Sequence, residues 1–205
     1  GGHFGAGNDI AEFGVLRNDP AKCRAYGQAM ADAMMAVERA TKPVIAAIEG
    51  SCFGASVALT LTADFRVAAN NARFAITPAK LGALYLRSDL HRLVAAIGQG
   101  QARRMIYTAV TLEASEAANI GLLDQLVPPD QFDAALDAVC QSILRGSPFT
   151  LRHSKRMLRS AGHGETPVED EQSLGWFVAA MQGADFAEGY AAFMAKRSPE
   201  FRKDG

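Results

Sequence analysis

Residues 44–68, VIAAIEGSCFGASVALTLTADFRVA, decide the fold of this chain. The apolar run from Val44 to Ile48 is typical of a short buried strand, and it ends at a glycine-containing turn. A second apolar run predicts a helix from about Ala55 to Thr62, and Asp64 to Ala68 predicts the next strand. A strand, a helix and a strand at this spacing are typical of a parallel α/β unit.

The segments on either side of this stretch are mainly helical. Pro20 to Thr41 has apolar residues at helical spacing and is followed by Pro43, which predicts one amphipathic helix. Two helical segments from Leu90 to Tyr107 meet at the glycines of residues 98–100. Further helices are expected at residues 112–120, 130–144, 148–161, 168–181 and 186–196, with a short strand in LLDQLVPP between the first two. We therefore expect a mixed α/β core over residues 1–128 and a helical region over residues 129–205.

The composition is that of an ordinary globular protein and narrows the class of partner. The chain has 205 residues, of which 49% are hydrophobic, and its 21 Lys and Arg are balanced by 22 Asp and Glu. This balance disfavours binding to nucleic acid or to anionic lipid. The apolar runs are too short to span a membrane, and we expect a cytoplasmic protein. Cys23, Cys52 and Cys140 are odd in number and lack metal-type spacing, so neither a disulfide framework nor a metal site is expected.

Two glycine-containing loops are candidates for binding negative charge. In the turn of residues 50–54, the predicted helix begins at Ala55, whose N–H has no partner within the helix and could bind an oxyanion. The alternative is that these glycines only let a strand and a helix pack closely. The loop FGAGNDI, residues 4–10, also has small residues that let backbone approach a ligand, and Asp9 can cap the residues that follow. Two such loops could supply two N–H donors to one oxygen.

Five segments of the chain carry a family resemblance. HFGAGNDIAEF resembles the F-x-A-G-A-D-[LI] loop of the crotonase superfamily, the enoyl-CoA hydratases and isomerases. EGSCFGASVALTLTADFRVA and ARFAITPAKLG resemble the two segments that follow in that family. The strand through GLLDQLV and the closing AFMAKRSPEF are similar to its later motifs. The five matches occur in the family's order over nearly the whole chain.

The resemblance implies a crotonase-like ββα superhelix with a C-terminal helical region. It implies that the backbone N–H groups of Asn8 and Ala55 hold the thioester oxygen of an acyl-CoA as this oxygen becomes enolate-like. Coenzyme A is then part of the substrate, no cofactor is tightly bound, and the chain forms a homotrimer or a dimer of trimers. The chain opens in loop sequence without Met, so the N-terminal part of the fold is expected to be missing. The residues that the resemblance places at coenzyme A are Ala6, Gly7, Asp9, Ile10, Gly54, Phe193 and Lys196.

The chain departs from the family at the residues that handle protons. The hydratases use two glutamates to position and deprotonate water, and the matching positions here are Ala58 and Pro78. Neither side chain can carry a proton, so standard hydration of a 2-enoyl-CoA is not expected. The scaffold leaves lyase or isomerase chemistry on an acyl-CoA open, and also a catalytically inactive acyl-CoA binder.

The segment LGALYLRSDLHRL, residues 81–93, is the best place to look for a replacement. Tyr85 or Asp89 could act as an acid or base, and Arg87 could bind a carboxylate of the acyl group. The alternative is that Asp89 caps the following helix and pairs with Arg87 on the surface. His3 is a weaker candidate beside the first loop.

A different mechanism is also compatible with the turn. Gly50 to Gly54 matches G-x-C-x-G, the cysteine form of the nucleophile elbow of α/β-hydrolases, with Cys52 as the nucleophile. Asp124 with His153 or His163 would follow in the order that this fold requires. This alternative leaves the other four matched segments unexplained.

Overall fold

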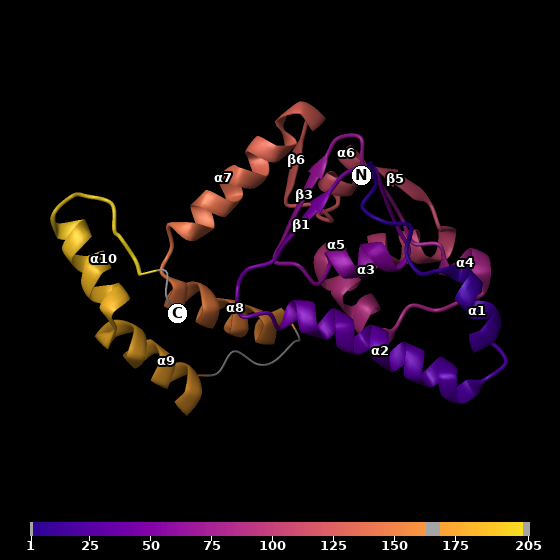
Figure 1. Ribbon diagram of the computed structural model, residues 1–205, viewed down its shortest axis with the longest axis horizontal. Helices are drawn as coiled ribbons and strands as arrows, with labels where there is room; N and C mark the ends of the chain where they lie inside the picture. The colour runs from indigo at the N-terminus through magenta and orange to yellow at the C-terminus, as the bar shows by residue number, and fades with distance from the viewer. Residues whose placement is uncertain (1, 163–168, 203–205) are drawn as a thin grey trace. The chain divides into compact units, whose positions relative to one another are not determined.

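A computed structural model describes residues 2–162 and 169–202 of the chain (Figure 1). The chain forms two compact units. Unit 1 comprises Gly1–Ala40 and Val44–Leu136, and unit 2 comprises Thr41–Pro43 and Asp137–Gly205. The division falls inside helix α7 (Phe132–Leu144).

The first sheet of unit 1 confirms the predicted parallel α/β arrangement. Its strands are β1 (Ile45–Ile48), β3 (Phe65–Ala69) and β6 (Gln125–Val127), in the order β1-β3-β6 (Figure 1). Both pairings are parallel. The carboxylate of Asp64 accepts a hydrogen bond of 2.7 Å from the N–H of Val44, and Asp124 accepts one of 2.8 Å from the N–H of Arg66. These two aspartates therefore bind the backbone at the starts of β1 and β3.

The second sheet of unit 1 lies in segments that the sequence pattern does not predict as strands. Its strands are β2 (Ser51–Phe53), β4 (Arg73–Ala75) and β5 (Thr111–Glu113). β2 pairs parallel to β4, and β4 pairs antiparallel to β5. The expectation of one continuous turn between β1 and the next helix is therefore wrong. The chain turns at Gly50, forms β2 and turns again at Gly54, and both glycines have a positive φ.

The helices of unit 1 agree with the expected ones in place more than in exact bounds. The break predicted between residues 98 and 100 is confirmed, because Gly98 has a φ of 71° inside α5. Leu112 was expected to begin a helix, but it is fully buried on β5, and α6 starts two residues later. The helices are α1 (Ile10–Leu16), α2 (Pro20–Glu38), α3 (Ala55–Thr60), α4 (Pro78–Leu81), α5 (Arg87–Thr108), α6 (Ala114–Asn119) and the 3₁₀ turn η1 (Pro129–Gln131).

The core of unit 1 is built from side chains of both sheets and of the helices against them. Ile48 of β1 and Phe74 of β4 are fully buried, and so are Leu93 and Met105 of α5. Burial of such apolar side chains contributes roughly 1.5–3 kcal/mol each. The two sheets are thereby held in fixed positions, and the loops between them are positioned accordingly.

The regular elements in the described part of unit 2 are helices. After α7 it contains α8 (Pro148–Gly162), α9 (Glu171–Gln182) and α10 (Ala184–Met194). Asp170 caps α9 in a reciprocal arrangement with Ser173. The ammonium of Lys155 donates a 3.0 Å hydrogen bond to the carbonyl of Lys42, which joins residues 41–43 to α8.

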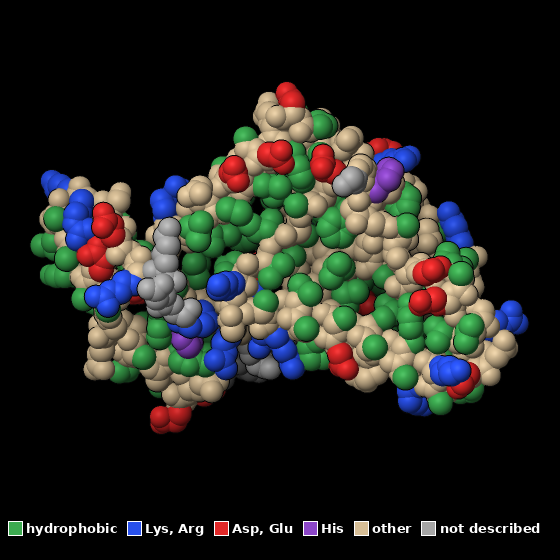
Figure 2. All heavy atoms as spheres, in the orientation of Figure 1, with side chains coloured by type: hydrophobic (Ala, Val, Ile, Leu, Met, Phe, Trp, Pro, Cys, Tyr) green, Lys and Arg blue, Asp and Glu red, His purple; other side chains and the backbone are tan. Residues whose placement is uncertain are grey.

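The surface carries charges of both signs. Figure 2 shows Lys and Arg interspersed with Asp and Glu over the visible face. Within residues 2–162 and 169–202, no helix combines the length and the apolar character that a membrane crossing requires.

Candidate active site

The two glycine-containing loops lie against each other at the start of α3. Gly5 forms a parallel bridge with Cys52 of β2, and the N–H of Phe53 donates to the carbonyl of Gly5 at 2.9 Å. The N–H of Gly7 donates to the hydroxyl of Ser56 at 3.1 Å. The first loop therefore runs alongside β2 and reaches the first turn of α3. Sequence reasoning missed Ser56, because its role depends on a loop 49 residues away.

Gly7 is the point of closest approach between these loops. Its φ is +93°, and a Cβ built on it would lie 3.0 Å from the amide nitrogen of Ala55 and 3.0 Å from the carbonyl oxygen of Phe53. Only glycine has both the backbone freedom and the small size for this position. The close approach brings the backbone of residues 7 and 8 beside the N-terminus of α3.

The predicted donors, the N–H groups of Asn8 and Ala55, are both available. Ala55 is the first residue of α3, where an N–H has no acceptor within the helix. Among the residues that the structure describes, neither N–H donates a hydrogen bond to a protein acceptor. Asp9 caps α1 through a 2.9 Å hydrogen bond from the N–H of Ala11, as predicted, and the side chain of Ile10 is exposed.

The two positions that match the hydratase glutamates hold no ionisable group. Ala58 lies on α3 and is buried in the core. Pro78 is the first residue of α4. A reaction at this site therefore cannot use a carboxylate from either position.

Tyr85 lies in the loop before α5, and its hydroxyl donates a hydrogen bond to the carbonyl of Gly54. The ring packs against the core of unit 1. Burial raises the pKa of the Tyr85 phenol above its usual range, and the nearby carboxylate of Asp89 raises it further. The hydroxyl therefore keeps its proton and acts as a hydrogen-bond donor.

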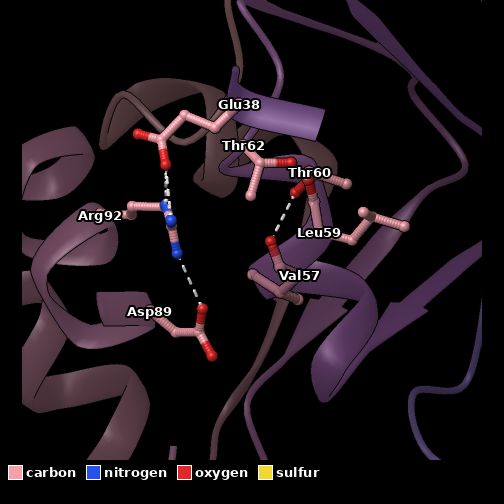
Figure 3. Close-up of polar contacts among 7 residues, drawn as sticks. All are labelled: Glu38, Val57, Leu59, Thr60, Thr62, Asp89 and Arg92. Carbon is pink, nitrogen blue, oxygen red and sulfur yellow. Dashed lines mark hydrogen bonds and ion pairs between the residues drawn. The ribbon is translucent and has the colours of Figure 1, made fainter. Parts of the chain in front are cut away.

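Asp89 belongs to a buried group of three charges (Figure 3). Arg92 lies between Asp89 and Glu38, with its guanidinium 3.1 Å from the first carboxylate and 2.6 Å from the second. Only 2% of the Asp89 side chain is exposed. Burial raises the pKa of this carboxyl, and Arg92 partly opposes the rise.

The expected surface pair of Asp89 with Arg87 is wrong, and so is the expected cap. Leu86 is the N-cap of α5 and no side chain caps it, while Asp89 is buried and pairs one turn later with Arg92. Arg87 begins α5 and is exposed. In the same close-up, the hydroxyls of Thr60 and Thr62 bond to backbone carbonyls of α3, so these buried groups are satisfied locally (Figure 3).

The geometry does not support the cysteine hydrolase. Cys52 is fully buried on β2, and burial raises the pKa of its thiol to about 12, so the thiolate that a nucleophile needs is suppressed. Asp124 is bound to Arg66. The ring of His153 lies near those of Phe149 and Trp176, tilted to both, and His163 lies outside the described residues.

The side chain of His3 is hydrogen-bonded to the backbone of β2. Its Nδ1 accepts a 3.0 Å hydrogen bond from the N–H of Ser51, at the first residue of β2. The imidazole is thereby held on the strand that carries the turn.

Unit 2 contains the remaining predicted residues and a cavity. Phe193 of α10 is 80% exposed, and Lys196 follows α10 in a left-handed conformation with a φ of 52°. Phe193 also lines a cavity of about 610 Å³ together with Phe149, Phe186, Tyr190 and the side chain of Arg152. The sequence pattern gave no signal for this cavity, because its lining comes from α8, α9, α10 and the segment after α10.

Comparison with known proteins relates the chain to a single family. The sequence model of the family described as enoyl-CoA hydratase/isomerase matches residues 1–204. The chain is 28% identical over 200 residues to the methylmalonyl-CoA decarboxylase of Escherichia coli K12, covering 97% of this chain and 76% of that protein. It is 32% identical over 202 residues to a crotonyl-CoA hydratase of Syntrophomonas wolfei, covering 97% of this chain and 75% of that protein.

Solved structures agree. A crystal structure of an enoyl-CoA hydratase/isomerase family protein from Hyphomonas neptunium is similar to this chain with a TM-score of 0.92 and 39% identity. The similarity covers 98% of this chain and 76% of that one.

Proposed function

Because the chain belongs to the enoyl-CoA hydratase/isomerase family, whose members act on acyl-CoA, we propose that it stabilises the enolate of an acyl-CoA thioester. The N–H groups of Asn8 and Ala55 hold the thioester oxygen as negative charge develops on it. The observation that supports this most directly is the close approach of Gly7 to the amide of Ala55, beside two N–H groups that are not engaged elsewhere among the described residues. Donors fixed in advance stabilise such charge without reorganisation.

The enolate is proposed to form by loss of carbon dioxide. Ala58 and Pro78 offer no base to remove an α proton. A thioester with a carboxylate on its α carbon needs none, because the bond between that carbon and the carboxylate breaks and its electron pair enters the enolate. A proton then adds to the α carbon. The similarity to a methylmalonyl-CoA decarboxylase supports lyase chemistry of this kind.

The proposed proton transfer by Tyr85 or Asp89 remains a prediction. The proton of Tyr85 is donated to Gly54, and Asp89 is ion-paired with Arg92. Asp89→Asn tests the second residue. Asp89 is a proton-transfer group if this variant loses exchange of the α proton with solvent while it still binds the thioester. Unchanged exchange would contradict the assignment.

Coenzyme A is proposed to bind as part of the substrate, with no cofactor held permanently. The assembly is proposed to be a homotrimer or a dimer of trimers, because α9 and α10 present large exposed apolar side chains such as Phe177 and Phe193. A cytoplasmic location is proposed from the composition, and cell fractionation would test it. The residues proposed to contact coenzyme A are Ala6, Gly7, Asp9, Ile10, Gly54, Phe193 and Lys196.

The proposed function is tested by offering the purified chain methylmalonyl-CoA, malonyl-CoA and crotonyl-CoA. Release of carbon dioxide from one of the first two, with incorporation of solvent deuterium at the α carbon, is expected. Efficient hydration of crotonyl-CoA would contradict the proposal. Calorimetry separates the remaining outcomes: binding without turnover would mean an inactive acyl-CoA binder, and no binding to any thioester would overturn the proposed function.

A further inference from the structure

The hydroxyl of Tyr85 bonds to the same peptide group that carries a proposed oxyanion donor. Its acceptor is the carbonyl of Gly54, and the next atom along the chain is the amide nitrogen of Ala55. We propose that Tyr85 is a positioning residue that orients and polarises this peptide group, so that the N–H of Ala55 is aimed at the thioester oxygen. This inference rests on the proposed function, because it assigns a role to a side chain that supports the proposed oxyanion hole.

The geometry of a peptide group explains how a bond to its oxygen controls its N–H. The group is planar and trans, so its C=O and N–H point in opposite directions. A donor that holds the carbonyl oxygen of Gly54 therefore fixes the direction of the N–H of Ala55. Gly54 has a φ of 55° and a ψ of −129°, a conformation in which glycine leaves the following peptide group free to rotate unless it is held.

Other contacts hold the neighbouring peptide group and supply a first donor to the carbonyl of Gly54, to which Tyr85 adds a second donor from outside α3. The N–H of Gly54 donates to the carbonyl of Ala75 on β4 at 2.9 Å, which fixes the preceding peptide group. The N–H of Val57 donates to the carbonyl of Gly54 at 3.0 Å from within α3. Tyr85 comes from 31 residues further along the chain, and so joins the loop before α5 to the start of α3.

The second part of the role is electronic. A hydrogen bond received by a carbonyl draws electron density from the N–H of the same peptide group and strengthens it as a donor, by a cooperative effect in a medium of low polarity. The carbonyl of Gly54 receives two such bonds, from Val57 and from Tyr85. The benefit grows with the charge on the substrate oxygen, so it acts on the enolate more than on the bound thioester.

The state of the phenol agrees with this role. The groups facing it that can carry charge are Asp89 and Cys52, and both disfavour its ionisation, as does its burial. The proton therefore stays on the Tyr85 oxygen and remains donated to Gly54. A phenol used in this way aims and polarises a donor, whereas the acid/base role predicted from the sequence would require the same proton to leave.

The test uses the carbonyl stretch of a bound thioester. Propionyl-CoA labelled with ¹³C at the carbonyl is bound to the purified chain, and its stretching frequency is read by infrared or Raman difference spectroscopy. Hydrogen bonds in an oxyanion hole lower this frequency. Wild type, Tyr85→Phe and Tyr107→Phe are compared, since Tyr107 is a 73% exposed tyrosine on α5 and serves as the matched control.

Tyr85→Phe is expected to reduce the downshift while Tyr107→Phe leaves it unchanged. In turnover of the thioester that loses carbon dioxide, Tyr85→Phe is expected to lower kcat roughly tenfold with little change in KM. This loss is smaller than the roughly hundredfold loss in kcat that follows removal of a direct oxyanion donor. A downshift equal to that of wild type in Tyr85→Phe would overturn the positioning role and leave the proposed function intact. No downshift in wild type itself would overturn the proposed function.

A second variant covers the case in which Tyr85→Phe does not fold. 3-Fluorotyrosine at position 85 keeps the ring and the hydroxyl but makes the phenol a stronger donor. The positioning role predicts a larger downshift in this variant than in wild type. An unchanged frequency would contradict it.

Discussion

Arg92 is the residue on which the buried charges of unit 1 depend. It is itself buried and stands between Glu38 and Asp89, two carboxylates that are also largely removed from solvent. Arg92→Met keeps much of the side-chain volume but removes the guanidinium that contacts both carboxylates. Breaking a buried pair in this way typically costs about 3–5 kcal/mol, and we expect a loss of unfolding free energy of that size by urea denaturation.

The matched control for Arg92 is Arg104→Met. Arg104 pairs with Glu116 at 2.6 Å, but both side chains are 42% exposed. An exposed pair contributes at most about 1 kcal/mol, so this variant should lose little. Equal losses in the two variants would show that burial does not set the contribution of the Arg92 group.

Gly7 is the second residue whose substitution is expected to have a large effect. Gly7→Ala places a methyl group 3.0 Å from the nitrogen of Ala55, at a φ of +93°. We expect turnover to fall by about 10²-fold or more, because the oxyanion donors are displaced. The backbone strain should also lower the unfolding free energy by about 1–3 kcal/mol.

Gly14→Ala is the control for Gly7. Gly14 lies inside α1, and a Cβ there meets no atom within 4 Å. This change should raise stability by roughly 0.5–1 kcal/mol and leave turnover unchanged. Retained turnover in Gly7→Ala would contradict the placement of the oxyanion hole between the two loops.

At the scale of elements, an ion pair between Arg197 and Glu188 joins the segment after α10 to that helix. Arg197 donates two hydrogen bonds to the carboxylate of Glu188, and the N–H of Glu200 donates a third. These contacts lower the pKa of Glu188 from 4.5 to about 2. The carboxylate therefore stabilises the folded state above pH 4.5, and this stabilisation is lost as the pH falls towards 2.

An NMR titration of the Glu188 side-chain carbon tests this contact. Wild type should titrate well below the usual range, and Arg197→Gln should move the midpoint up towards 4.5. Arg145→Gln, an exposed change elsewhere in unit 2, should not move it. A midpoint near 4.5 in wild type would mean that the ion pair does not persist in solution.

Elements with long periodic patterns could be predicted from the sequence, and most of the short ones could not. The exception is β6, a three-residue strand that was predicted because prolines follow it. The parallel strands around Val44 to Ala68 and the long helices follow from apolar spacing and from proline and glycine signals. β2, β4 and β5 each have three residues, too few for alternation to be recognised. β2 is further concealed because its residues lie between two glycines.

The same contrast applies to the candidate site. The two loops could be identified because glycine and small residues mark close backbone approach. The bond from Tyr85 to Gly54 and the pairing of Arg92 with Glu38 span 31 and 54 residues, so only tertiary structure reveals them. The Asp89–Arg92 pair is three residues apart on one helix, and helical spacing alone favours it over the expected pair with Arg87.

At the scale of the whole molecule, the exposed apolar side chains of unit 2 call for a partner surface. Phe177 on α9 is 65% exposed, and Phe193 on α10 is 80% exposed. If these helices form the proposed trimer contact, Phe177→Glu should shift the mass in analytical ultracentrifugation from the trimer towards the monomer. Tyr107→Glu, a similarly exposed change on α5 of unit 1, should leave the mass unchanged. A monomeric wild type would contradict the proposed assembly.

The order of strands in the first sheet has a consequence for synthesis of the chain. β3 lies between β1 and β6, and the contact of Arg66 with Asp124 spans 58 residues. At a ribosomal rate of about 5–20 residues per second, one edge of β3 stays uncovered for roughly 3–12 seconds after it is made. During that time its backbone N–H and C=O groups are open to pairing with another nascent chain. The nascent chain therefore has to keep this edge of β3 from pairing with other chains until β6 is made and covers it.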